Sequence, residues 1–281
     1  DFKNLGYSHI FVMDGGSTDG TIDIAKAAGA TVHVQSRKGK GNAIIEALDI
    51  IDRPYVLMLD GDGTYSCTDA EKMIQPLFRG YDHVIGNRLD SAGPGAFSRL
   101  NLFGNRLINW GFKVAHRRDL KDILSGYRAF SLDSMRQMHL KEEGFEIETE
   151  MSVGAVRNNQ RVMVVPVAYA QRAGTNTKLN PFQDGVRITG AVYRLAKTNN
   201  PLFYFGLVGI VITIFGSLTG VYVLSEWLRG IEHIPLTILT VLLITVGFEI
   251  FMFGVISDMM LSFHREVIRE IQLQQPPKPP Q

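Results

Sequence analysis

The sequence predicts an α/β domain with a mostly parallel sheet, followed by two helices that cross a membrane as a hairpin. From residue 8 to residue 172, short β-branched runs alternate with amphipathic stretches, the pattern of strand and helix units in a parallel sheet. Farther along, Leu202–Leu224 contains no charged residue and Pro235–Ser257 contains only Glu249. Apolar runs of this length are sufficient to cross a hydrocarbon layer of about 30 Å.

The predicted strands and helices alternate along the α/β part. Asp19 and Thr21 are the capping candidates of the first helix, and Thr68 with Glu71 forms a capping box before the third. The expected strands are His9–Met13, Thr31–Gln35, Tyr55–Leu59, His83–Ile85 and Arg161–Val167, and the expected helices are Thr21–Ala28, Gly41–Ile51, Asp69–Phe78, Arg99–Val114 and Ile147–Asn158.

The overall composition excludes several classes of protein. The 281 residues are 45% hydrophobic and 20% charged, and the formal net charge is +1. These values do not fit a disordered chain, a collagen or a protein that coats nucleic acid. Cys67 is the single cysteine, so no intrachain disulfide can form and a reducing compartment suits the domain.

The segment between the domain and the first apolar run is expected to be a helix at the membrane surface. In Asp184–Thr198, apolar positions alternate with Arg187, Arg194 and Lys197 at helical spacing, although an ordinary domain helix would show the same pattern. The expected divisions are a catalytic domain at 1–183, this interfacial helix at 184–200, the two spans at 201–260 and a tail at 261–281.

The charges around the spans predict their orientation in the cell membrane. Basic residues precede the first span, and Arg265 and Arg269 follow the second, whereas the connecting loop contains only Arg229. The positive-inside rule then places the domain and the tail in the cytoplasm. A buried helical pair of a soluble protein is the alternative.

Two features of the hairpin concern helix packing. Gly216 and Gly220 form a small-xxx-small pair that would let the two helices approach closely. Glu249 is costly within a membrane, so it indicates either an oligomer contact, which we favour, or a residue on a lipid path. A homo-oligomer formed through the hairpin is therefore an expected partner.

Two carboxylates follow the third predicted strand. Asp60 and Asp62 come directly after the apolar run ending at Leu59, and Gly61 and Gly63 make the turn. Ligands bind at the carboxyl ends of strands in open α/β sheets, and paired carboxylates suit a hard divalent cation that also takes phosphate oxygens. A solvated turn is the alternative interpretation.

A second polar turn follows the first predicted strand. Asp14 is followed by Gly15, Gly16 and Ser17, and a helix starts shortly afterwards. Such a turn offers backbone N–H groups to a phosphate, while Asp14 can accept a hydrogen bond from a nucleobase or ribose. A purely structural turn with Asp19 as the cap is the alternative.

Three further segments, Gly86–Arg88, Asp122–Arg128 and Arg172–Lys178, complete a set of motifs. With the two aspartate turns, they resemble the inverting glycosyltransferases of family-2 type, which have the Rossmann-like glycosyltransferase-A fold. Within that family the set is similar to dolichyl-phosphate mannose synthases, and most similar to archaeal dolichyl-phosphate glycosyltransferases that initiate S-layer N-glycan assembly. The family's first strand has no counterpart here, so we expect the sequence to begin inside the domain.

The resemblance implies a role for each matching residue. Asp60 and Asp62 would hold Mg²⁺ or Mn²⁺ against the donor diphosphate, and Thr64 stands where the synthases often have Gln, as a further candidate for the metal. The acceptor phosphate would contact Arg88, Arg99, Arg128 and Ser125. The nucleotide-sugar donor would contact Asp14, Gly16, Asp60, Arg172 and Lys178. Catalysis would depend on Asp60, Asp62, Arg88, Arg99 and Arg128. A surface salt bridge is the alternative for each single arginine.

The expected reaction transfers a hexose from a nucleotide sugar to dolichyl phosphate with inversion, at the start of protein N-glycosylation. The second pKa of a phosphate monoester is about 6, so the attacking oxygen is already anionic and no strong base is required. Glu146, Glu148 and Glu150 either orient sugar hydroxyls, serve a base-like role or simply provide favourable charge at a helix start.

The sugar is left open, and a UDP-linked donor is expected by resemblance. Neither Trp110 nor Trp227 follows an arginine, so the Gln-x-x-Arg-Trp signature of processive polysaccharide synthases is absent. The competing functions are a silent membrane scaffold of the same fold and a sugar-phosphate nucleotidyltransferase.

Overall fold

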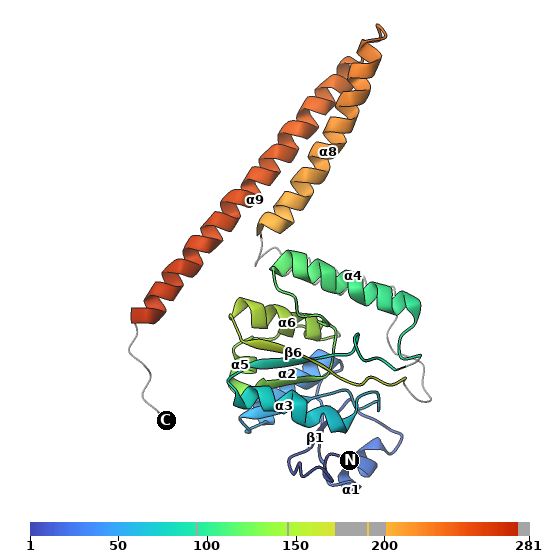
Figure 1. The fold of residues 1–281 in the computed structure, drawn as a ribbon, viewed down its shortest axis with the longest axis vertical. Coiled ribbons are helices and arrows are strands. Elements are labelled where there is room, and N and C mark those ends of the chain that lie inside the picture. Colours follow the sequence, from blue (N-terminus) through green and yellow to red (C-terminus); the bar gives the residue numbers. More distant parts are fainter. Residues whose placement is uncertain (94, 145, 172–189, 191–200, 275–281) are drawn as a thin grey trace. The chain divides into compact units, whose positions relative to one another are not determined.

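The computed structural model describes residues 1–93, 95–144, 146–171, 190 and 201–274 (Figure 1). The chain divides into two compact units, Asp1–Val192 and Tyr193–Gln281, which are considered separately. The first is an α/β unit and the second a pair of long helices, so the predicted fold class is confirmed. The predicted interfacial helix, apart from Gly190, lies outside the described residues.

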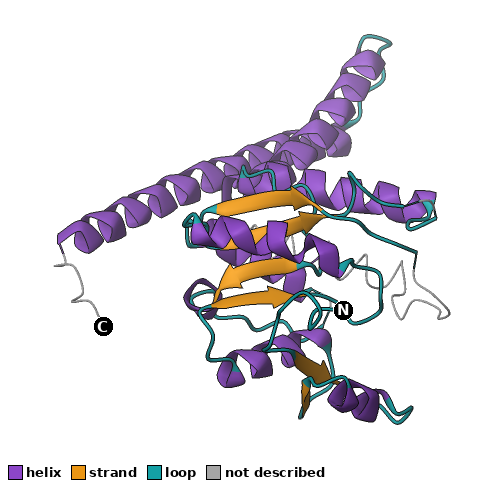
Figure 2. Cartoon of the chain, turned by 60° about the horizontal axis from the view of Figure 1, so that its bottom comes forward, coloured by secondary structure: helices purple, strands orange, loops and turns teal. Residues whose placement is uncertain are grey.

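Two sheets form the α/β unit, and helices lie on both sides of the larger one (Figure 2). In the smaller sheet, β1 and β2 are parallel; in the larger sheet, the strand order is β3, β5, β4, β6, and only β5 runs antiparallel to its neighbours. The strands are β1 (Phe11–Asp14), β2 (Thr31–Val34), β3 (Tyr55–Met58), β4 (His83–Asn87), β5 (Arg128–Ser131) and β6 (Val162–Pro166).

The sequence did not predict β5. This strand lies between β3 and β4, and its first three residues are buried. A four-residue strand that begins with arginine and is covered on both faces lacks the polar–apolar alternation by which a half-buried strand is recognised. The other five strands match their predicted positions to within two residues at either end.

The predicted helices of the α/β unit are confirmed, and α5 is an addition. The predicted caps of the first helix are wrong, because Gly20 is the N-cap of α1 and makes no side-chain cap bond, although Asp19 accepts a hydrogen bond from the amide of Thr21. The predicted capping box is wrong, because Ser66 instead accepts from the amide of Thr68 and a 3₁₀ turn, Cys67–Asp69, precedes the helix. The helices are α1 (Thr21–Ala27), α2 (Lys40–Ile50), α3 (Ala70–Phe78), α4 (Arg99–His116), α5 (Leu132–Arg136) and α6 (Ile147–Arg157).

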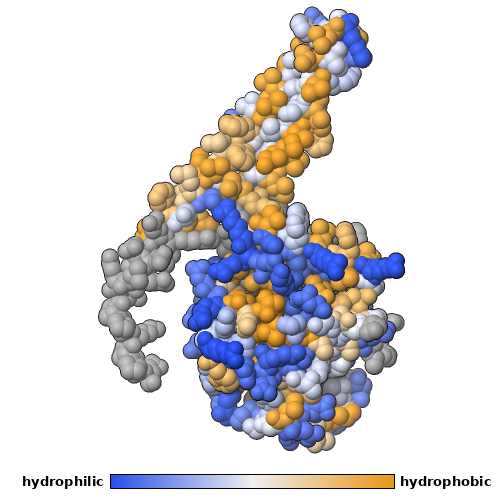
Figure 3. Space-filling model, viewed as in Figure 1, coloured by the Kyte–Doolittle hydropathy of each residue, from blue (hydrophilic) through white to orange (hydrophobic). Residues whose placement is uncertain are grey.

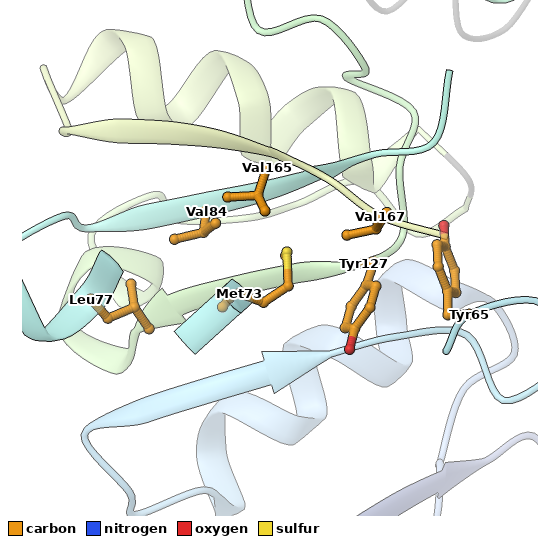
Figure 4. Packing of buried hydrophobic residues seen from close by; sticks show 8 residues of the cluster. Tyr65, Met73, Leu77, Val84, Tyr127, Val165 and Val167 are labelled. Atoms are coloured by element: carbon orange, nitrogen blue, oxygen red, sulfur yellow. The ribbon is translucent and has the colours of Figure 1, made fainter. Parts of the chain in front are cut away.

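Apolar clusters cover both faces of the larger sheet. On one face, Met73 and Leu77 of α3 pack with Val84 and Val165, as Figure 4 shows. On the other, Phe130 packs with residues of α2, α5 and α6. Burial on both faces fixes the sheet and therefore the loops at the strand ends, where the candidate site lies.

The second unit is a hairpin of α8 (Pro201–Trp227) and α9 (Ile234–Gln274). A Cβ atom on Gly209 would lie 2.6 Å from the carbonyl oxygen of Gly247, and one on Gly216 would lie 2.8 Å from Ile244. Gly220 lies against Thr240. Glycines therefore permit the close helix contact, as the Gly216 and Gly220 pair predicted.

Apolar side chains cover much of the outer surface of the hairpin in Figure 3. Pro201–Trp227 and Ile234–His264 are each long and apolar enough to cross a membrane. Glu249 is exposed on α9. The expected start of a tail at residue 261 stays a prediction; α9 runs through this position as one helix to Gln274.

Candidate active site

Asp60 and Asp62 lie directly beyond the carboxyl end of β3, where the sequence predicted them. Asp62 accepts hydrogen bonds from the Thr64 amide at 3.2 Å and the Thr64 hydroxyl at 2.6 Å. Thr64 is 2% exposed, so it orients Asp62 and its hydroxyl proton is directed at that carboxylate. This geometry favours a supporting role for Thr64 over the predicted metal contact.

Lys40 was not predicted from the sequence and lies between two carboxylates. Its Nζ atom forms ion pairs with Asp60 and, at 2.5 Å, with Glu148. Burial lowers the pKa of Lys40, but the charges of Glu148 and Asp60 outweigh this and raise the pKa above its ordinary value. Lys40 therefore remains protonated at neutral pH, and the group of three carries a net charge of about −1.

The loop that precedes α2 explains how Lys40, the first residue of that helix, reaches this position. Gly39 has a φ of 119°, and the amide of Gly41 donates to the carbonyl of Glu143 at 2.9 Å. A Cβ atom on either glycine would collide with the backbone of residues 142–143. A lysine between two glycines at a helix start was the signal that the sequence offered for this residue.

Glu148 is the member of the glutamate series that belongs to the site. It is 4% exposed; Oε1 contacts Lys40, and Oε2 is buried with no hydrogen-bond partner among the described residues. Glu150 instead accepts from the amides of Lys141 and Glu142 at 2.9 and 2.8 Å, and Glu146 immediately precedes α6. One of the three glutamates therefore lies beside Asp60, and Glu150 holds a loop.

Gly126 allows a loop to lie against the Asp60 carboxylate. A Cβ atom there would collide with Oδ2 of Asp60 and lie 2.9 Å from the Lys40 Nζ atom. The Gly126 amide donates to the Tyr65 hydroxyl at 3.1 Å, and the Tyr65 ring packs 5.0 Å from that of Tyr127. This loop therefore forms part of the wall around Asp60.

Asp14 closes its own turn. Its carboxylate accepts from the amides of Gly16 and Ser17 at 2.8 and 2.7 Å and from the Ser17 hydroxyl at 2.7 Å. These bonds, chiefly those from Ser17, lower the pKa of Asp14. Gly16 supplies the positive φ, 89°, that the turn requires. Contacts of Asp14 and Gly16 with the donor remain predictions.

Arg88 forms a buried, two-pronged ion pair with Asp122. Its Nε and Nη2 atoms lie 2.8 and 2.9 Å from the two carboxylate oxygens, and its backbone amide adds a third bond. The guanidinium also lies 5.6 and 5.3 Å from the ring centres of Phe97 and Tyr169. Burial alone would lower the pKa of Arg88, but Asp122 keeps it raised. Much of its hydrogen-bonding capacity is thus already used.

Arg128 and Ser125 are both fully buried, at 0% exposure. Arg128 donates to the carbonyl oxygens of Ser125, Ile123 and Glu148 at 2.9, 2.6 and 2.9 Å. Burial lowers the pKa of Arg128 to about 10, so it stays charged at neutral pH. Side chains without exposed surface do not reach a phosphate in this structure. We therefore revise their expected acceptor contact to a role in holding the loop.

Arg99 differs from the other two arginines. It is exposed at the start of α4, just after the Ser98 cap, and has no hydrogen-bond or ion-pair partner among the described residues. Of the expected acceptor ligands, Arg99 is the exposed one, and no residue in the described ranges neutralises its charge. Arg172 and Lys178, the expected donor ligands, lie outside the described residues, so their roles remain predictions.

The carboxylates at the end of β3 suit a divalent cation that binds the substrate diphosphate at the same time. In the described part of the chain, no group of three or more His, Cys, Asp and Glu side chains is arranged around a metal position. Asp60 and Asp62 nevertheless supply two carboxylates, and Mg²⁺ is commonly held by one or two carboxylates with water and phosphate oxygens. The residues present therefore suit a cation that completes its coordination with a diphosphate.

Comparison with known proteins identifies several relatives, one of which matches almost the whole chain. It is 50% identical over 275 residues to the glycosyltransferase AglJ of Haloferax volcanii, covering 97% of this chain and 91% of the relative. It is also 30% identical to a dolichyl-phosphate hexose transferase of the same archaeon, covering 68% of this chain and 82% of the relative.

The fold comparison agrees with the sequence comparison. Glucosyl-3-phosphoglycerate synthase of Mycobacterium tuberculosis, solved with Mn²⁺ and UDP-glucose, matches with a TM-score of 0.53 at 22% identity, covering 66% of this chain and 67% of that one. The fold is therefore that of the glycosyltransferase-A enzymes. The model of glycosyl transferase family 2 matches residues 5–142, and with the 50% identical relative this shows that the chain belongs to glycosyl transferase family 2.

Proposed function

We propose that this protein transfers a hexose from a nucleotide sugar, most simply a UDP-sugar, to dolichyl phosphate with inversion at the sugar carbon. The product would be the first lipid-linked sugar of a protein N-glycan. The observation that carries the proposal is the pair Asp60 and Asp62 at the end of β3, with Lys40 and Glu148 beside them. The dolichyl-phosphate hexose transferase among its relatives supports the acceptor, and the solved structure with Mn²⁺ and UDP-glucose supports the donor.

Asp60 and Asp62 would hold the Mg²⁺ or Mn²⁺ ion. A divalent ion at this position supplies positive charge to the donor diphosphate and to the leaving nucleoside diphosphate. Lys40 fixes one oxygen of Asp60, and Thr64 fixes the Asp62 carboxylate, so neither has to be oriented when donor binds. Such preorganisation lowers the cost of binding charged groups.

Glu148 would act on the sugar and not on the acceptor proton. Dolichyl phosphate is largely ionised at neutral pH because the second pKa of a phosphate monoester is about 6. Its oxygen can attack directly, which would convert an α-linked donor into a β-linked product in one displacement. The Oε2 atom of Glu148 is buried and has no hydrogen-bond partner among the described residues, and donor binding would have to open it to a sugar hydroxyl.

The acceptor phosphate would meet exposed basic side chains. Arg99 is available in the described structure, and Arg172 and Lys178 are the remaining candidates by resemblance. Planar guanidinium groups bind phosphate with two hydrogen bonds, which favours arginine here. Arg88 has a less available guanidinium and would act mainly through Asp122.

The hairpin would anchor the enzyme where its lipid acceptor is found. α8 and the first part of α9 are proposed to span the cell membrane, with the catalytic domain, assigned to residues 1–183, and the C-terminal tail both on the cytoplasmic side. Residues 184–200 would form the interfacial helix, and Glu249 would make an oligomer contact. Anchoring keeps the phosphate of a long polyprenol within reach of the site.

Mass spectrometry of the lipid products tests the proposal. The full-length protein in detergent is incubated with dolichyl phosphate, a panel of nucleotide sugars and Mg²⁺ or Mn²⁺, with a chelator control. A dolichyl monophosphate hexose that requires metal is the expected product. Release of pyrophosphate would instead indicate a nucleotidyltransferase, and no product from folded protein with any donor would favour the scaffold.

An active-site substitution provides the matched control in cells. Asp62→Ala is expected to stop the modification of surface glycoproteins, whereas Asp52→Ala, at a side chain that is 78% exposed, is expected to leave it unchanged. Unchanged glycosylation with Asp62→Ala would contradict the enzymatic proposal and favour the scaffold.

A further inference from the structure

The outer face of α4 carries an apolar stripe that the α/β unit does not cover. Five large apolar side chains recur at intervals of three and four residues, and each is between 41% and 70% exposed. At 1.5 Å per residue the stripe is about 21 Å long. Its members are Leu100, Phe103, Leu107, Trp110 and Val114.

The orientation of α4 is fixed by its opposite face. Phe112 and Ala115 are completely buried in the α/β unit, so the helix cannot rotate to bury the stripe without exposing them. Contiguous exposed apolar surface of this kind is uncommon on soluble proteins and marks an interaction site. Orange and blue atoms lie together over the part of the surface where Figure 1 draws α4 (Figure 3).

A row of basic residues follows the stripe. Arg99, Arg106 and Lys113 recur every seven residues, each immediately before a stripe residue, and all three are exposed. Lys113 forms an ion pair with Asp119 at 2.9 Å. The helix itself, residues 99–116, contains neither Asp nor Glu. An apolar face flanked by basic residues is the arrangement by which helices lie in the interface of an anionic bilayer.

We propose that α4 docks the catalytic unit onto the anionic surface of the membrane, with the stripe in the interfacial layer and the basic row at the lipid headgroups. The occupant is the bilayer because the exposed face combines apolar side chains with charged side chains that are all basic, and because the hairpin of the same chain would itself lie in a bilayer. This inference rests on the membrane attachment proposed above. Docking would hold Arg99, at the first turn of α4, level with lipid phosphates.

Tryptophan fluorescence of the full-length protein in vesicles tests the docking. The chain has two tryptophans, so Trp227→Phe leaves Trp110 of the stripe as the single reporter. In vesicles containing anionic lipid, Trp110 emission is expected to shift to the blue. The emission should be mostly lost when the lipids are brominated near the headgroup, because interfacial helices lie at a depth of about 5–10 Å. Unshifted, unquenched emission would overturn the proposal.

A blue-shifted emission that brominated lipid does not quench would also overturn it, because a protein surface would then cover the stripe. Leu107→Asp in the same background is expected to restore solvent-like emission. Ile24→Asp, at a side chain that is 70% exposed on α1, is the matched control and should change nothing.

The converse variant separates this inference from the proposed membrane attachment. Trp110→Phe leaves Trp227, at the end of α8, to report on the hairpin. If the protein fails to float with the vesicles after alkaline washing, the attachment itself is wrong. If it floats while Trp110 remains unquenched, the attachment holds and the docking of α4 is wrong.

Discussion

Two charged clusters of the α/β unit differ in how completely their hydrogen-bonding atoms are paired within the fold. In the carboxylate cluster, Lys40 lies between Asp60 and Glu148, and one oxygen of Glu148 has no hydrogen-bond partner among the described residues. In the arginine cluster, Arg88 is neutralised by Asp122, and Arg128 is surrounded by acceptors. The first cluster retains an oxygen atom without a described hydrogen-bond partner, whereas the guanidinium donors of the second are largely used within the fold.

The difference separates groups that bind a substrate from groups that hold the loops around it. A buried charge with complete partners is costly to disturb and gains little from a ligand. A carboxylate cluster with net negative charge at a strand end attracts a cation instead. Motifs that look equivalent in the sequence therefore predict different losses when they are mutated.

The largest expected effect is on the carboxylate side. Asp60→Asn keeps the size of the side chain but removes one of the two charges for the metal, so we expect kcat for lipid glycosylation to fall at least about 100-fold. Initial rates at saturating Mg²⁺ or Mn²⁺ measure this, with Asp52→Asn as the control. Retained turnover would remove the metal assignment.

On the arginine side we expect a loss of stability in place of a specific loss of activity. Arg128→Met leaves the carbonyls of Ser125 and Ile123 without their donor. Arg88→Met leaves the buried Asp122 carboxylate without its counter-charge, with only the backbone amide of residue 88 of the three bonds retained. Each is expected to cost about 3–5 kcal/mol of unfolding free energy. Thermal unfolding in detergent measures it.

Arg161→Met is the control for these two changes. Arg161 is exposed and lies 5.0 Å from the ring centre of Tyr81, so its loss is expected to cost less than about 1 kcal/mol. If Arg128→Met unfolds like the native protein but needs far more dolichyl phosphate, Arg128 contacts the acceptor and our revision is wrong.

A buried side chain without a hydrogen-bond partner in the described part of the chain extends the comparison to pH. His116 is 7% exposed, neither ring nitrogen has a hydrogen-bond partner among the described residues, and burial lowers its pKa to about 4. The unfolded chain takes up the proton near pH 6.5, so His116 reduces stability as the pH falls from about 6.5 to 4, by up to about 3 kcal/mol.

The slope of the unfolding temperature between pH 7 and pH 4.5 measures this contribution. His116→Gln is expected to make that slope shallower, and His9→Gln, at an exposed position, is expected to leave it unchanged. An identical slope in the native protein and in His116→Gln would show that His116 takes up its proton in the folded state as readily as in the unfolded state.

Local sequence patterns predicted what local forces determine. The apolar run before Asp60 forms β3, and the uncharged run from Leu202 onward forms α8, because burial and spacing act within a few residues. The pairing of Lys40 with Glu148 joins the starts of two helices far apart in the sequence, so no periodicity reveals it.

The arginines also show that local sequence patterns do not predict which side chains the fold buries. Residue type and motif placed Arg88, Arg99 and Arg128 in one functional class, but burial divides them. Whether a guanidinium is covered depends on strand order and on the insertion of β5 between β3 and β4, which the sequence did not predict. The positions were therefore predictable and the roles were not.

The smallest effect we expect comes from Arg99, and it tests the comparison most directly. Because Arg99 has no described partner, Arg99→Ala should unfold like the native protein and raise the KM for dolichyl phosphate about 10-fold, the worth of roughly one charged hydrogen bond, while the donor KM stays unchanged. Arg106→Ala, seven residues along the same exposed face, is the matched control. An equal rise in both variants would mean that Arg99 acts through the charge of the membrane surface, whereas a rise confined to Arg99→Ala indicates a direct contact with the acceptor phosphate.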